Sequence, residues 1–205
     1  MTSPRFDSSA RATMNKTRFE AFSDGVIAII ITIIVLEMRV PHSESFEALA
    51  PVVPVFLSYV LSFVYFGIYW NNHHHMLHAT SAVTWSMLWA NLHLLFWLSL
   101  IPFTTGWMGE NHFAAAPVAL YGLVLLFAAV AFRLLQQLII TSQGHDSILK
   151  KAIGSDWKGK LSLIVYAIAI PLAFVSRWVP LGLYLLIALL WLVPDKRIEL
   201  ALSRE

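Results

Sequence analysis

Two polar clusters in an otherwise apolar chain carry the side chains that could do chemistry. Carboxylates and imidazoles in such clusters can relay protons, bind cations or coordinate metal ions. One cluster opens a long apolar segment and the other closes the next one. Their members are Arg18, Glu20, Ser23 and Asp24 in the first, and His73, His74, His75 and His78 in the second.

The histidine run does not predict a metal centre, although His74 and His78 are four residues apart and would share one helix face. No group of acids or cysteines accompanies it, and the chain has no cysteine at all. No nucleophile–base set is recognisable either. We therefore expect no metal, no cofactor and no enzymatic activity, and a mainly structural role for the histidines.

Asp24 needs a partner, because an acid within a membrane helix costs roughly 2.5–3.5 kcal/mol on insertion scales. Arg18 is six residues away and cannot reach it from the same helix face. We expect a histidine from the end of the second helix to pair with Asp24 or Arg18. A different use of the same residues stays open: a secondary transporter or proton-coupled carrier with Asp24 and His73–His75 as its relay.

The element that carries Asp24 is predicted to be a helix from Arg18 to Met38, about 31 Å long at 1.5 Å per residue. Thr17 and Glu20 have the spacing of a capping box. The residues from Gly25 to Leu36 are apolar on every side except for one hydroxyl. That length and composition match the hydrocarbon core of a bilayer, about 30 Å thick.

The whole chain repeats this pattern. It is 58% hydrophobic and only 13% charged, with a mean hydropathy of +0.69. We predict an all-α, polytopic membrane protein with a polar tail at 1–16, a six-helix domain at 17–197 and a second tail at 198–205. The six spans are expected at about 18–38, 51–76, 84–105, 114–141, 161–176 and 178–193, with a turn at 106–112 and a polar loop at 142–160.

Basic residues predict the orientation. Of the 14 lysines and arginines, eleven lie in the tails, at the start of the first helix and in the 142–160 loop. These eleven would lie on one side of the membrane. Only Arg39 and Arg177 would lie on the opposite side, and Arg133 lies within a span. Both termini are therefore expected in the cytoplasm. Arg133 is expected to snorkel to the headgroups or to pair with a buried acid.

At 100° per residue, Ile29, Ile33 and Leu36 lie within about 40° of one direction on the first helix. Phe22 and Arg18 continue that stripe, while Asp24 points about 140° away. From the residues alone these can be ordinary packing side chains. Thr32 flanks the stripe, and its hydroxyl is expected to bond the Ala28 carbonyl. In the third helix, Asn91 and His93 are expected to bond other helices.

The motif Arg18-x-x-x-Phe22-Ser23-Asp24 resembles the first helix of the transmembrane protein 175 family, endolysosomal potassium channels with single-repeat homologues in bacteria and archaea. Further matching residues are Thr32, Glu37, Pro41, Trp70, His73, His74, Asn91, Leu92 and the run Leu100-Ile-Pro-Phe103. The resemblance therefore covers about residues 18–105.

The resemblance implies a homotetramer in the lipid bilayer of a prokaryotic cell membrane, with the first helices around a central path for monovalent cations. Potassium would be the favoured permeant ion, without the carbonyl filter of ordinary potassium channels. The isoleucine that forms the pore constriction in the family corresponds to Ile29. The next apolar residues along the pore would be Ile33 and Leu36. The threonine linked to potassium preference in the family corresponds to Thr32. At position 28, where some members carry a hydroxyl side chain, this sequence has Ala28.

The resemblance also implies a supporting network on the cytoplasmic side of the first helix. Glu37, at the other end, could concentrate cations at the outer mouth, or could pair with Arg39 or a lipid headgroup. The network residues are Arg18, Phe22, Ser23, Asp24, Trp70, His73 and His74.

Overall fold

The computed structural model describes residues 16–192 except 37, 81, 145, 146 and 155. Both predicted tails and Glu37 therefore lie outside the described residues, apart from Lys16. The described chain is a bundle of helices: α1 (Lys16–Leu36), the short 3₁₀ helix η1 (Phe46–Val52), α2 (Val53–His78), α3 (Trp85–Ser99), α4 (Ile101–Glu110), α5 (Ala115–Gln143), α6 (Ile148–Ile153), α7 (Trp157–Leu172) and α8 (Trp178–Leu192).

Four helical segments are long and apolar enough to cross a membrane: Lys16–Leu36, Phe46–His78, Trp85–Glu110 and Ala115–Gln143. α7 and α8 have 16 and 15 residues, or about 24 and 22 Å of helix. The prediction of an all-helical membrane protein is confirmed. Six spans and the side on which the termini lie remain predictions.

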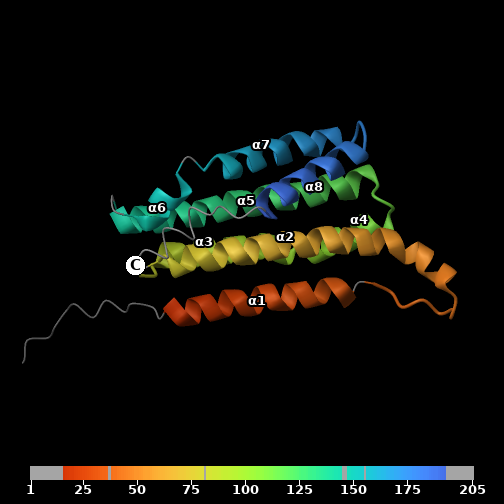
Figure 1. The fold of residues 1–205 in the computed structure, drawn as a ribbon, viewed down its shortest axis with the longest axis horizontal. Helices are drawn as coiled ribbons and strands as arrows, with labels where there is room; N and C mark the ends of the chain where they lie inside the picture. Colours follow the sequence, from red (N-terminus) through yellow and green to blue (C-terminus); the bar gives the residue numbers. More distant parts are fainter. Residues whose placement is uncertain (1–15, 37, 81, 145–146, 155, 193–205) are drawn as a thin grey trace, which may run out of the picture.

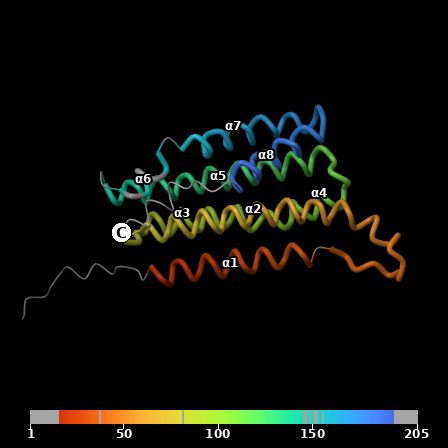
Figure 2. Tube along the Cα trace, viewed as in Figure 1, coloured from red at the N-terminus to blue at the C-terminus, as the bar shows by residue number. Residues whose placement is uncertain are grey.

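The helices run roughly along the long axis of the molecule, and α4 continues in the direction of α3 before α5 returns (Figure 1). α1 is the outermost helix on one side and packs on α2, α3 and α4, while α5 contacts α3, α4, α7 and α8. The tube in Figure 2 shows that α1 begins, α2 ends and α6 lies at the same end of the bundle. We call this end the basic end.

The third predicted helix is two helices in the structure. α3 ends at Ser99 and α4 continues from Ile101 to Glu110, so the turn predicted at 106–112 was wrong. Pro102 lies in the first turn of α4, where its missing N–H leaves no partner unpaired. Gly109 lets α4 approach α2, because a Cβ there would lie 2.6 Å from the Cα of Val55.

The true turn lies after Glu110 and holds two residues with positive φ, His112 at 49° and Phe113 at 59°. The polar loop predicted at 142–160 contains α6 and the start of α7. Ser147 begins α6, since its hydroxyl accepts the N–H of Lys150 at 3.2 Å. The observed helix boundaries differ from the predicted ones because capping hydroxyls and close packing determine them, and hydropathy does not detect either.

A cluster of buried tyrosines joins α2, α5, α7 and α8. The Tyr65 hydroxyl donates to the carbonyl of Tyr184 (2.7 Å). It also accepts a hydrogen bond from the Tyr166 hydroxyl (3.1 Å). The Tyr184 hydroxyl donates to the carbonyl of Val118 on α5 (3.2 Å). These hydrogen bonds connect α2, α5, α7 and α8, whereas α1 packs on α2, α3 and α4.

Candidate functional site

α1 divides into a buried face and an exposed face. The exposed fractions of the predicted stripe are 59% for Ile29, 41% for Ile33 and 79% for Leu36. These side chains are therefore not core residues of the subunit. The opposite face packs on α2, α3 and α4, and its buried residues are Phe19, Ser23, Ile27, Ile30 and Ile34.

Thr32 is exposed beside this stripe. Its hydroxyl donates to the carbonyl of Ile29 at 2.8 Å, and not to that of Ala28 as the sequence suggested. A hydroxyl carries one donor and two lone pairs. With its proton directed at the backbone, the Thr32 oxygen keeps its lone pairs available on the exposed face.

The buried face carries a polar network that connects three helices. The Asn91 amide of α3 donates to the Ser23 hydroxyl of α1 at 2.9 Å, and Ser23 donates in turn to the carbonyl of Phe19 at 3.0 Å. His73 of α2 lies 2.8 Å from the Asn91 amide oxygen through Nε2. Since that oxygen only accepts, Nε2 carries the proton. The predicted interhelical role of Asn91 is confirmed.

The partner of Asp24 is Trp70, whose indole N–H donates to the carboxylate at 3.1 Å. The expected histidine partner was wrong, because His73 faces Asn91 one turn further along α2. His74 stacks on Trp70 and His78 stacks on His74, with ring centroids 5.9 and 6.3 Å apart. Aromatic spacing at i and i+4 was the sequence signal for this column.

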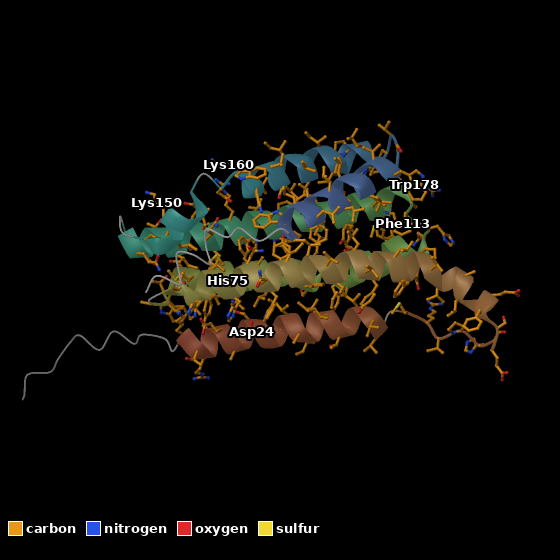
Figure 3. The ribbon with its side chains drawn as sticks, viewed as in Figure 1. Asp24, His75, Phe113, Lys150, Lys160 and Trp178 are labelled. Atoms are coloured by element: carbon orange, nitrogen blue, oxygen red, sulfur yellow. The ribbon has the colours of Figure 1, made fainter. Side chains whose placement is uncertain are left out.

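Asp24 lies toward the basic end, as do His75, Lys150 and Lys160, whereas Phe113 and Trp178 lie at the opposite end (Figure 3). Among the described residues, no group of three or more His, Cys, Asp or Glu side chains is placed to hold a metal ion.

The predicted network residues separate into two sets. Ser23, Asp24, Trp70, His73 and His74 are brought together. Arg18 and Phe22 lie on the exposed face of α1, and Phe22 is 53% exposed.

Contacts elsewhere bear on three further expectations, although that for Glu37 stays a prediction because Glu37 lies outside the described residues. Arg133 pairs with Asp156 at 3.1 Å, so the second of its two expected roles is correct. Arg39, the partner considered for Glu37, lies 3.2 Å from Glu110. His93 accepts the indole N–H of Trp97 on its own helix, and therefore its predicted interhelical bond was wrong.

Comparison with known proteins places these features in a family. The family described as "Endosomal/lysosomal potassium channel TMEM175" matches residues 18–102. A protein of Chryseobacterium sp. named a potassium channel is 53% identical over 192 residues, covering 94% of this chain and 100% of that protein. A potassium channel of Streptomyces collinus is 33% identical and covers 86% of this chain and 91% of its own length.

A solved structure has the same fold. The crystal structure of a lysosomal potassium-selective TMEM175 homolog from Chamaesiphon minutus superimposes with a TM-score of 0.73 at 27% identity. The superposition covers 88% of this chain and 97% of that chain.

Proposed function

The chain belongs to the TMEM175 family and is a potassium channel of the membrane, and from this premise we propose that it is a homotetramer that conducts along its first helices. Four copies of α1 would surround a central path that favours potassium over sodium. The observation that carries the proposal is the exposed stripe of Ile29, Ile33 and Leu36 on a helix whose other face is packed.

The stripe suits a constriction. Four isoleucines around an axis would form a narrow apolar neck at Ile29, and apolar necks can stop ion flow by dewetting. Ile33 and Leu36 would add layers above it. The oxygen of Thr32, with its lone pairs directed away from the helix, could replace part of the water around a potassium ion. Ala28 offers no second hydroxyl at that level.

The buried network supports such a path because it fixes the rotation of α1. Ser23 is bonded to Asn91 of α3, and Asp24 to Trp70 of α2. Turning α1 by one residue would rotate the stripe by about 100° and break both bonds. We assign the network the role of a positioning element, outside the ion path.

The arrangement in the membrane completes the proposal. Six spans would place both termini in the cytoplasm of a prokaryotic cell, with the basic end facing the cytosol. The short helices α7 and α8 would span with the bilayer locally adjusted to their length. Glu37 would lie near the outer mouth.

The test is conduction by purified protein in planar bilayers. Ile29→Asn should raise the current, because a wider and more polar neck stays wet, and Thr32→Ala should lower the potassium-over-sodium ratio. Val35→Asn is the matched control: Val35 is 42% exposed but points about 120° away from Ile29. Equal currents for the Ile29 and Val35 variants would contradict the proposed path.

One observation favours the alternative, a proton-coupled carrier. Nδ1 of His73 is buried without a hydrogen-bond partner among the described residues, so it could accept a proton near Asp24. A carrier would move potassium against its gradient when a proton gradient is imposed on proteoliposomes. Purely downhill flow that is unchanged by the proton gradient would exclude this alternative.

A further inference from the structure

A partly enclosed cavity of about 50 Å³ lies between α2, α5, α7 and α8, on the side of the subunit that α1 does not cover. A water molecule needs about 10–15 Å³ of such space, so the cavity holds several waters or the polar part of a larger molecule. The residues that matter for its chemistry are Tyr69, Arg133, Gln136, Asp156 and Trp191.

The wall of the cavity has hydrogen-bonding capacity that the protein does not use. Gln136 is only 8% exposed; its amide has no hydrogen-bond partner within the described part of the chain, and it is open to the cavity and not sealed from water. The Tyr69 hydroxyl, on a side chain 9% exposed, has no partner there either. These two groups leave a small polar patch in a wall that is otherwise mostly apolar.

The rim of the cavity is positively charged. Arg133 uses one of its N–H groups to bond Asp156 at 3.1 Å, and the guanidinium has further donors. Lys158 lies 5.9 Å from the centre of the Trp191 ring, and Lys160 is exposed two residues further along α7. Among the described residues, Arg133 and Lys160 place two cations near the Asp156 carboxylate, which favours an anion.

The surroundings favour an anion that also has an apolar part. Aromatic rings form much of the wall, and α7 exposes Leu161, Ile164 and Ile168 beyond the rim. A small soluble anion would gain nothing from these surfaces. A phospholipid could place its acyl chains along α7 while its headgroup enters the cavity.

We propose that this cavity binds the headgroup of an anionic phospholipid from the leaflet at the basic end. The phosphate would contact Arg133 and Lys160, and headgroup hydroxyls would bond Gln136 and Tyr69. The same phosphate chemistry exists in a free phosphate ester, so the experiment separates the two sources. The site is independent of the path proposed along α1.

The experiment counts bound lipid by native mass spectrometry of the delipidated protein in detergent. Phosphatidylglycerol is the probe, phosphatidylcholine the zwitterionic comparison and glycerol 3-phosphate the soluble comparison. Gln136→Leu removes the unpaired amide, and Gln137→Leu, on an exposed side chain next to it, is its control. Lys160→Gln is paired with Lys150→Gln, the same charge change on α6.

We expect phosphatidylglycerol to bind more tightly than phosphatidylcholine. Gln136→Leu should weaken it roughly five- to tenfold, the loss of one or two buried hydrogen bonds, and Lys160→Gln severalfold. Both controls should leave binding unchanged. Equal binding of the two lipids, or no effect of Gln136→Leu, would overturn the proposal. Equally tight binding of glycerol 3-phosphate would assign the cavity to a soluble anion instead. None of these readouts depends on ion flow.

Discussion

At the scale of single residues, α1 buries the Ser23 hydroxyl among apolar side chains inside the subunit and leaves other large apolar side chains exposed. Ser23 is fully buried and bonded, whereas Ile29 and Leu36 are more than half exposed. Large apolar side chains left exposed are typical of a helix that faces lipid or another subunit, and not of one that faces water. In a membrane, lipid accepts apolar faces and polar groups must find partners within the protein.

Asn91 is the residue on which the network depends, because it bonds both Ser23 and His73. Asn91→Leu keeps the volume but removes both bonds, and it leaves the His73 N–H buried without an acceptor. We expect the unfolding free energy in detergent to fall by about 1–3 kcal/mol. Thermal denaturation followed by circular dichroism measures this loss.

The control is Asn71→Leu, on an exposed position of α2. It should leave the melting temperature nearly unchanged. A stability of the Asn91 variant equal to that of the Asn71 variant would show that the network does not hold α1.

At the scale of elements, close helix contacts depend on glycines that the hydropathy pattern does not distinguish. Gly122 of α5 faces Tyr184 of α8, and a Cβ at Gly122 would overlap the Tyr184 hydroxyl. The ring of Tyr184 is fully buried and cannot move aside. By contrast, a Cβ at Gly182, on α8 itself, would meet no heavy atom within 4 Å.

Gly122→Ala should therefore destabilise the protein by about 1–3 kcal/mol, the usual result of overpacking. Gly182→Ala should be neutral or slightly stabilising, because alanine favours a helix by up to about 1 kcal/mol over glycine. Melting temperatures of the two variants in the same detergent make the comparison. Equal losses would mean that α5 and α8 do not pack as described.

At the scale of the whole molecule, the exposed face of α1 decides whether four copies share an axis. The chain has no cysteine, so a single introduced thiol reports on its neighbours without background. Leu36→Cys, at the exposed end of α1, should form disulfide-linked dimers on mild oxidation in membranes. A side chain on the axis meets its copies, whereas one that faces lipid does not.

Val35→Cys provides the matched position, since Val35 is also exposed but points away from the stripe. It should cross-link much less, as seen on a non-reducing gel. Native mass spectrometry of the unmodified protein should give a particle of four 23.1 kDa chains. Cross-linking at Val35 and not at Leu36, or a particle of one chain, would contradict the tetramer around α1.

The sequence alone determined the class of protein and much of the candidate site. Long apolar runs require a membrane, since too few polar residues remain to cover a soluble globule. The motif Arg18-x-x-x-Phe22-Ser23-Asp24 identified the helix that matters. The spacing of Ile29, Ile33 and Leu36 predicted one stripe, and this stripe is exposed in the structure. The run lengths, the motif and the spacing are all local features, so they can be read from the sequence directly.

Only the tertiary structure decided which polar groups meet. Asp24 bonds Trp70 and not a histidine, His73 bonds Asn91, and Arg133 bonds Asp156. These partners are 46, 18 and 23 residues apart. Which residues come within hydrogen-bonding distance depends on how far each helix is rotated and shifted against its neighbours. Packing at positions such as Gly109 and Gly122 sets that rotation and shift, and no periodicity along a single helix encodes them.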